Sequence, residues 1–175
     1  MKRLASAAGI SETQVYNYFR SREKLLIELA RREFQSIETA RQAAIGQGHD
    51  HYSRVELSTR TYLRQMSERG WLLQMLLMSP DVRTMRRKEL RERRKMTLPA
   101  HAQALVDLYG IPHAVALGST AVLTRLTVRT GQLIADRKVS PEFGERLCMA
   151  MVLNGSRDIV RLNGSADRAQ GIQAA

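Results

Sequence analysis

The sequence predicts an all-α protein, and three observations support this fold class. Residues that favour helices, chiefly Ala, Leu, Arg, Glu, Gln and Met, dominate the 175 residues. β-Branched residues are scattered, and no Asn-Gly or Asp-Gly turn separates runs of alternating hydrophobicity. Glycine, proline and serine interrupt the helical patterns at intervals that leave about eight helices. We expect the breaks at residues 8–11, 20–21, 46–53, 69–70, 79–80, 97–99, 110–112 and 137–141, and a tail after residue 163.

Residues 2–20 show the pattern of a helix-turn-helix unit. The residues of the first short helix that we expect to face inward are Leu4, Ala5 and Ala8. Gly9 suits the positive φ of a helix stop, Ile10 is expected to fill the turn, and Ser11 starts a second short helix. A turn of this length sets two helices at a steep angle, so that the second can enter a DNA major groove.

A long helix follows this unit. Ser21 can cap a helix from Arg22 to about Ala44, which buries one apolar side. The residues expected on that side are Leu25, Leu26, Leu29 and Phe34. The segment 46–53 then predicts a flexible linker. It contains His49 and His51, but two histidines without a third ligand nearby do not make a metal site, and we expect no metal and no cofactor.

The composition limits the class of partner. The formal net charge of +11 favours an anionic partner, either nucleic acid or an acidic membrane surface. No stretch approaches the roughly 20 apolar residues of a membrane span, and no signal peptide precedes the first helix, so we expect a cytoplasmic protein outside the membrane. Cys148 is the only cysteine. It cannot form an intrachain disulfide, and we expect it to be a buried small apolar residue.

The segment "LASAAGIS", followed by "ETQVYNYF", resembles the DNA-binding unit of the tetracycline-repressor (TetR) family. Members of that family show a helix ending in Ala-Ala-Gly, an apolar-Ser turn and a recognition helix ending in Tyr-x-Tyr-Phe. The resemblance continues through Arg20 to Leu26. It implies DNA binding as a dimer, an effector site in the larger domain and a last pair of helices that forms the dimer. Family members carry a further helix before this point, so we expect a DNA-binding unit that is incomplete at its N-terminus.

The residues suggest roles within this unit. Val15 and Phe19 lie four apart and are expected to pin the recognition helix onto the helix from Arg22 and onto Leu4. The candidate base readers on the opposite face are Thr13, Gln14 and Asn17, because amides can pair with adenine edges and a Thr methyl can pack on thymine. Gln14 has a second possible role, since Ser11-x-x-Gln14 also fits a capping box.

A second set of side chains is expected to hold the phosphate backbone. The tyrosine hydroxyls can donate to phosphate oxygens, as the resemblance also implies, and the basic residues add affinity without sequence preference. An alternative is that one of the tyrosines packs inside the small domain, and that the first two basic residues are simply solvated. The candidate phosphate contacts are Lys2, Arg3, Ser11, Tyr16, Tyr18 and Arg22.

The remainder, residues 46–175, predicts a larger helical domain after a DNA-binding unit over residues 1–45. Methionine adapts to varied apolar shapes, so a Met-rich wall favours a pocket for an apolar or amphipathic effector, with ordinary core filling as the alternative. The candidate pocket residues are Met66, Trp71, Met75, Met78, Met85 and Met96. The segment "DVRTMRRKELRERRKM", residues 81–96, is strongly basic and indicates either a solvated helix face or a second anion-binding surface.

Two neighbouring helices near the C-terminus carry more apolar surface than a small chain can cover, which favours a four-helix interface between two copies; a purely intrachain core is the alternative. The candidate dimer residues are Val115, Val122, Leu126, Leu133, Leu147 and Met151. The sequence therefore predicts a ligand-responsive transcriptional regulator, most simply a repressor that binds a palindromic operator as a homodimer. A dimeric small-molecule-binding protein without DNA binding is the alternative. No phosphate-binding loop, Gly-x-Ser-x-Gly elbow or His-Glu-x-x-His motif indicates an enzyme.

Overall fold

The computed structural model describes the backbone of residues 1–173 and the side chains of residues 1–159 and 161. Seven helices and no strand occur in this part of the chain, which confirms the all-α prediction. The helices are α1 (Lys2–Ala8), α2 (Glu12–Tyr18), α3 (Arg22–Gly46), α4 (His51–Leu76), α5 (Pro80–Tyr109), α6 (His113–Ala135) and α7 (Pro141–Gln173).

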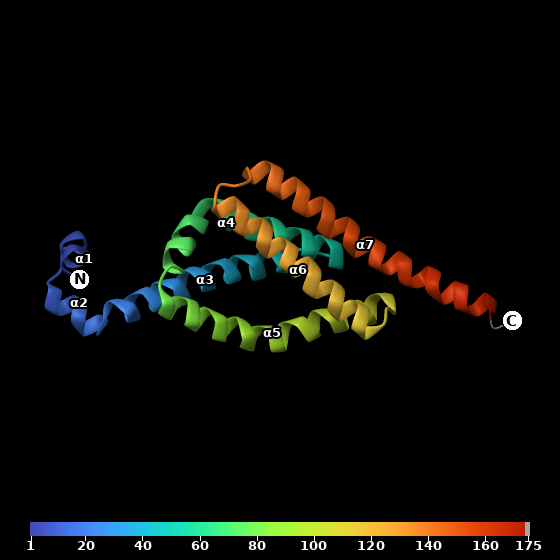
Figure 1. The fold of residues 1–175 in the computed structure, drawn as a ribbon, viewed down its shortest axis with the longest axis horizontal. Coiled ribbons are helices and arrows are strands. Elements are labelled where there is room, and N and C mark those ends of the chain that lie inside the picture. Colours follow the sequence, from blue (N-terminus) through green and yellow to red (C-terminus); the bar gives the residue numbers. More distant parts are fainter. Residues whose placement is uncertain (174–175) are drawn as a thin grey trace.

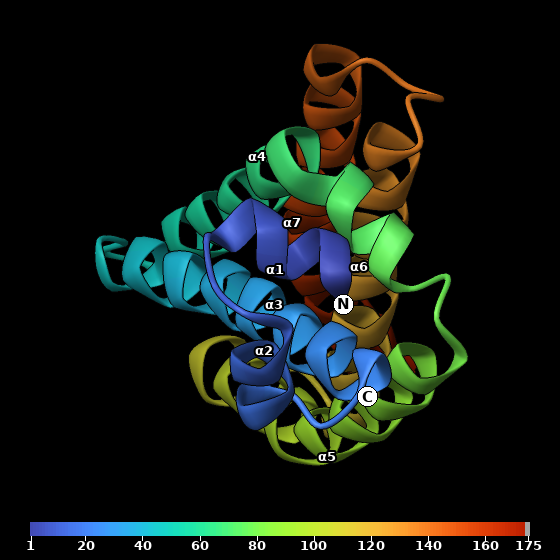
Figure 2. The same ribbon diagram turned by 90° about the vertical axis from the view of Figure 1, so that its left-hand side faces the viewer.

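The molecule is elongated, with α1 and α2 at one end and the long helices packed beyond them (Figure 1). α3 runs from the small N-terminal unit into the body and packs against α4 and α5, while α4 also contacts α6 and α7. Seen from the N-terminal end, α1 and α2 stand in front of the body (Figure 2). Among the described helices, α3 is thus the only one that continues directly from the N-terminal unit into the body.

Four clusters of buried apolar side chains hold the body together. Leu63, Ile134, Cys148 and Val152 join α4, α6 and α7, and the burial of Cys148 confirms its expected role. A second cluster joins α3 to α4 and α5, a third joins α3 to α4, and a fourth lies where α5 turns into α6. The members of these three clusters are Ala30, Leu76 and Val82; Ile37, Met66 and Leu73; and Ala102, Ile111 and Ala116.

The predicted break at residues 69–70 is wrong, because α4 continues through it. Gly70 serves close packing instead of a turn. A Cβ atom there would overlap the Ala135 side chain of α6. Gly131 plays the reciprocal part on α6, since its Cβ would lie 2.6 Å from Cε1 of Tyr62. The absence of two side chains allows α4 and α6 to approach each other, which outweighs the helix propensity of about 1 kcal/mol that each glycine costs.

The predicted break at residues 97–99 is also wrong. α5 passes through Pro99 and bows along its length (Figure 1). Proline cannot donate a backbone hydrogen bond and usually bends a helix that contains it. Val82 near one end of α5 and Ala102 beyond the proline are both fully buried, in different clusters. Packing at both ends therefore keeps the helix continuous. α7 likewise continues to Gln173, past the break expected after residue 163.

The segment 46–53 is a tight turn, which corrects the prediction of a flexible linker. Gly46 ends α3 and His51 begins α4. The Asp50 carboxylate accepts a hydrogen bond from Ser53 N–H at 2.7 Å, and the Ser53 hydroxyl accepts one from Asp50 N–H at 3.1 Å. This capping box fixes the start of α4. Two long helices joined by so short a turn must pack antiparallel.

Candidate nucleic-acid interface

The turn between α1 and α2 has the conformation that a helix-turn-helix requires. Gly9 adopts φ 66° and ψ 28°, in the left-handed region, as predicted. Its N–H donates to Ser6 O at 3.3 Å, and Ile10 N–H donates to Ala5 O at 3.1 Å. These two bonds close the end of α1 in the manner of a Schellman motif. The chain then enters α2 within two residues.

The side chains predicted to face inward from α1 are mostly exposed, which is a correction. Ala5 is buried, but Leu4 and Ile10 remain 40% and 38% exposed, and Ala8 is also exposed. Within the described residues, α1 makes its contacts with α2. A partner as short as α2 can cover only part of the apolar side of α1.

A capping box fixes the start of α2. Ser11 N–H donates to Oε1 of Gln14 at 2.9 Å, and Gln14 N–H donates to the Ser11 hydroxyl oxygen at 3.1 Å. The second role considered for Gln14 is therefore confirmed. The two roles are compatible, because the cap uses only the carbonyl oxygen of the amide and leaves the NH₂ group free to donate. The Ser11 hydroxyl likewise keeps its hydrogen for a phosphate oxygen.

α2 has one inner side and a broad exposed side. Val15 is 2% exposed and Phe19 is half-buried, which agrees with the inner pair expected four residues apart. The side chains of Thr13, Gln14 and Asn17 are exposed. They lie on the polar side of α2. Apart from the hydrogen bond that Gln14 accepts from Ser11 in the cap, these side chains make no hydrogen bond within the described structure that would compete with a ligand. The structure therefore leaves these three polar groups accessible.

The candidate phosphate contacts surround this exposed side. Tyr16 and Tyr18 are 49% and 78% exposed, so neither packs inside the small unit, and that alternative is wrong. Lys2, Arg3 and Arg22 are also exposed. The start of α3 is capped by the Ser21 hydroxyl, which accepts from Lys24 N–H at 3.3 Å. A phosphate near this end would meet the positive end of the helix dipole.

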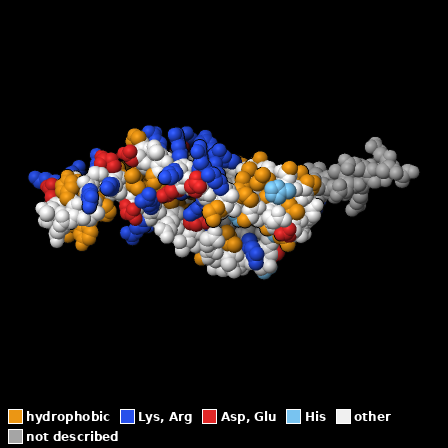
Figure 3. All heavy atoms as spheres, turned by 90° about the horizontal axis from the view of Figure 1, so that it is seen from below, with side chains coloured by type: hydrophobic (Ala, Val, Ile, Leu, Met, Phe, Trp, Pro, Cys, Tyr) orange, Lys and Arg blue, Asp and Glu red, His pale blue; other side chains and the backbone are white. Residues whose placement is uncertain are grey.

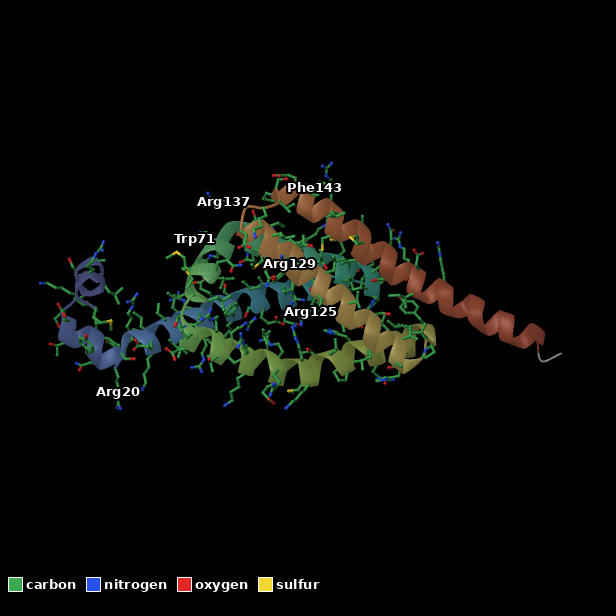
Figure 4. The ribbon with its side chains drawn as sticks, viewed as in Figure 1. Arg20, Trp71, Arg125, Arg129, Arg137 and Phe143 are labelled. Atoms are coloured by element: carbon green, nitrogen blue, oxygen red, sulfur yellow. The ribbon has the colours of Figure 1, made fainter. Side chains whose placement is uncertain are left out.

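Two features of this region are absent from the sequence-based set. Arg20 is exposed in the turn before α3 and points away from the ribbon there (Figure 4). The sequence signal that identifies Arg20 is its position directly after the aromatic residues Tyr18 and Phe19. Glu23 is the second feature, because the pKa of its carboxyl is lowered by hydrogen bonds from its own backbone N–H and from Ser21. Its negative charge partly offsets Arg22 beside it.

The six residues predicted to form an effector pocket do not gather in one place, which corrects that prediction. Met66 is buried in the core between α3 and α4. Trp71, Met75, Met78 and Met96 are between 56% and 77% exposed. Met85 alone of the six lines one of the two hollows described below. The Met-rich pattern does not reveal this, because helical spacing alone cannot tell which side of a helix a neighbour covers.

Two hollows in the described part of the body are lined by residues of α3. The larger, of about 860 Å³, lies between α3 and α5, and in its lining the Arg86 guanidinium stacks on Phe34, with Cζ 3.7 Å from the ring centroid. Loss of water around this group lowers the pKa of Arg86. Ile27 and Met85 add to the apolar lining of this hollow. The second, of about 510 Å³, lies among α3, α4 and the start of α7 and is lined largely by small side chains and by Arg60, Arg64 and Glu145.

The outer side of α6 and α7 is apolar and exposed. Val122 is 67% exposed, and Leu147 and Met151 are about half exposed, whereas Leu126 and Leu133 are partly covered. Gly144 packs against Ile134, and Gly155 lies near Leu123, so the two helices touch along their length. By the helical period, the exposed apolar residues of both helices flank this line of contact on the side away from α4. We call this surface, formed by Val115, Val122, Phe143, Leu147 and Met151, the α6–α7 face.

Residues 1–29 match the family model described as bacterial regulatory proteins, tetR family. The match covers α1, α2 and the start of α3, the same segment whose turn, caps and exposed side chains are described above. No curated protein matches the chain. No helix in the described part of the chain is long and apolar enough to cross a membrane. The described side chains also form no group of three or more His, Cys, Asp or Glu that could hold a metal ion.

Proposed function

We propose that this chain, whose residues 1–29 match the family model of the tetR regulators, is a dimeric repressor that leaves a palindromic operator when a small molecule binds its body. The observation that carries this proposal is the exposed polar side of α2. Thr13, Gln14 and Asn17 stand free of tertiary packing, while Val15 on the opposite side is buried. A helix positioned in this way can place its polar side chains against base edges in the major groove.

The division of labour within the unit follows from the chemistry of each side chain. Asn17 has a complete amide free for two hydrogen bonds to adenine, whereas Gln14 offers only its NH₂ group. Thr13 supplies a methyl group for thymine. The hydroxyls of Ser11, Tyr16 and Tyr18 and the charges of Lys2, Arg3, Arg20 and Arg22 hold the phosphate backbone, which positions α2 without reading sequence.

The α6–α7 face supports the homodimer. Exposed Val, Leu, Phe and Met side chains on two adjacent helices are costly in water, and pairing with a second copy across a two-fold axis buries both faces at once. The two α2 helices of such a dimer then read half-sites one helical turn, about 34–36 Å, apart. Leu126 packs against the core cluster that contains Leu63, and Leu133 is partly covered, so we place neither at the centre of this interface.

The hollow between α3 and α5 is the site that we propose for the effector. Ile27, Phe34 and Met85 supply apolar lining, and Arg86 supplies a positive charge, so a small amphipathic molecule with an acidic group suits it. α3 also carries the helix-turn-helix at its N-terminal end. A ligand that changes how α3 packs on α5 therefore changes the separation of the two α2 helices, which couples the two sites.

The test is selection of binding sites from random duplex DNA by the purified chain, followed by titration of the enriched sequence against salt. We expect a palindrome with half-sites one helical turn apart. Asn17→Ala should relax base preference, with a cost of about 1–3 kcal/mol at one position of each half-site. Arg22→Ala should weaken binding to all sequences alike and reduce the salt slope by about 1 per site.

The control for both variants is Ser6→Ala, at an exposed α1 position whose hydroxyl makes no hydrogen bond in the described structure. Equal losses on every sequence from Asn17→Ala and Arg22→Ala would contradict the assigned roles. A folded dimer that enriches no sequence would contradict the repressor function. It would favour the alternative, a dimeric ligand-binding protein without DNA binding.

A further inference from the structure

Four arginines form one stripe along α5. Arg83, Arg87, Arg91 and Arg94 lie at spacings of four, four and three residues, which places them on one side of the helix. At a rise of about 1.5 Å per residue, neighbouring residues of the stripe are only about 4.5–6 Å apart along the axis. All four side chains are exposed. Seen from the α5 side, Lys and Arg side chains gather over the middle of the molecule (Figure 3).

No acidic group of the described structure pairs with any of these four arginines. Acidic residues of α5 do form ion pairs, but away from the stripe: Glu89 binds Arg31 at 3.0 Å, and Glu92 binds Lys95 at 3.1 Å. Some arginines elsewhere in the body do have acidic partners, such as Arg69 with Glu33 at 3.0 Å and Arg93 with Glu38 at 2.8 Å. The stripe is therefore a local concentration of positive charge that no acidic side chain of the described structure neutralises directly.

This arrangement costs stability in the free protein. Like charges at i and i+4 on a helix repel each other and destabilise it. Such like-charge pairs recur along α5. The helix does not need these charges in order to pack, because the residues that anchor it face α3 and α4. An anionic partner that neutralises several guanidinium groups at once removes the repulsion.

The chemistry of the stripe favours the phosphate backbone of DNA over a lipid surface. A planar guanidinium group binds phosphate through two parallel hydrogen bonds, and a row of four matches a linear series of phosphates. A helix that inserts into a membrane surface needs apolar side chains beside its charges. Between the arginines of the stripe, Leu90 is partly buried, and the nearest large exposed apolar side chain is Met96, beyond its end.

We propose that Arg83, Arg87, Arg91 and Arg94 form a second DNA-backbone surface, separate from the helix-turn-helix, through which the protein holds a second stretch of duplex. Another region that concentrates exposed cations without ion-pair partners in the described structure is the N-terminal unit with the start of α3, which carries Lys2, Arg3, Arg20, Arg22 and Lys24. Two separate basic surfaces on one elongated chain allow it to bridge two duplex segments. This surface goes beyond the operator contact and does not require it.

The test compares two triple variants with an equal loss of charge. The first, Arg87→Gln with Arg91→Gln and Arg94→Gln, removes most of the stripe. The second, Arg64→Gln with Arg137→Gln and Arg146→Gln, removes exposed cations from α4, the α6–α7 turn and α7. Each full-length protein is titrated with a duplex of random sequence at several salt concentrations. Each is then tested for capture of a second, labelled duplex on beads that carry the first.

We expect the stripe variant to lower the salt slope of binding by roughly 2–3, since each phosphate contact contributes about 0.9, and to lose capture of the second duplex. The matched variant should keep both. The stripe variant should also melt no lower than the parent protein, because it loses like-charge repulsion. Identical salt slopes and capture for the two triple variants would overturn the proposal. Stripe-dependent binding to vesicles of acidic lipid, with DNA binding unchanged, would overturn it in favour of a membrane. A stripe variant that changes the oligomeric state would overturn it in favour of a contact between copies.

A third protein, with Thr13→Ala and Asn17→Ala, removes two of the proposed base-reading side chains and separates this proposal from the repressor. Loss of operator selection with a stripe-dependent salt slope that remains would support the second surface alone. Operator selection that survives in the stripe variant without any change in slope or capture would support the repressor and overturn the second surface.

Discussion

Different interactions stabilise the N-terminal unit and the helical body. Residues 1–20 bury only Ala5 and Val15, and their conformation depends on a left-handed glycine and a capping box. The body buries four apolar clusters between long helices. The unit thus relies on local hydrogen bonds, whereas the body relies on packing. The difference teaches that the unit keeps its side chains free for a ligand at the expense of its own stability.

The largest expected effect comes from the core of the body. Leu63 is 1% exposed in the cluster that joins α4, α6 and α7, so Leu63→Ala should lower the free energy of unfolding by about 2–5 kcal/mol. Chemical denaturation followed by circular dichroism measures it. Leu108→Ala, at a position that is 59% exposed, is the matched control and should change little. Similar losses from both variants would show that the body does not depend on this cluster.

A smaller effect on folding, with a large effect on assembly, is expected on the α6–α7 face. Val122→Asp puts a charge into a surface that the proposed dimer buries, so the dimer should dissociate at micromolar concentration while the monomer stays folded. Sedimentation or light scattering measures the change in mass. Leu108→Asp makes the same kind of change at an exposed α5 position and should leave the mass unaltered. A Val122→Asp protein with unchanged mass would contradict the assignment of this face.

The local stability of the N-terminal unit should fall more when a helix cap is lost than when a core contact is lost. Ser11→Ala removes the acceptor for Gln14 N–H, at a cost of about 1 kcal/mol that falls on α2 alone. Hydrogen exchange at the amides of α2 should accelerate, whereas exchange in α4 and α6 should not. Ser6→Ala on α1 provides the control. Protection lost equally across the body would mean that the two parts unfold as one unit.

The smallest effect concerns pH, and it should affect only the body, because residues 1–48 contain no histidine. The pKa of His51 is lowered from its usual value of 6.5, first by partial burial of the ring and then by the neighbouring His101. The unfolded chain therefore binds the proton before the folded chain does, and stability falls as the pH drops from about 6.5 towards the folded pKa. His51→Gln should reduce this slope of stability against pH, and His113→Gln, at an exposed position, should not. An identical slope in the two variants would contradict the shift.

By itself the sequence determined several features that depend on neighbouring residues. It predicted the all-α fold, the left-handed Gly9, the caps at Ser11 and Ser21 and the segment that matches the tetR family, because each signal lies within a few residues of the chain. The inner pair of α2 and its exposed polar side also follow from the helical period alone.

The tertiary structure decided which side of each helix is covered. Gly70 and Pro99 have the local chemistry of breaks, yet contacts with α6 and burial at both ends of α5 keep their helices continuous. Met66 and Met78 belong to one sequence pattern, but one is buried and the other is 77% exposed. Arg93 has an acidic partner on α3, whereas Arg94 beside it has none in the described structure. Contacts between distant residues made these distinctions, and no local pattern records them, since burial depends on where the other helices pack.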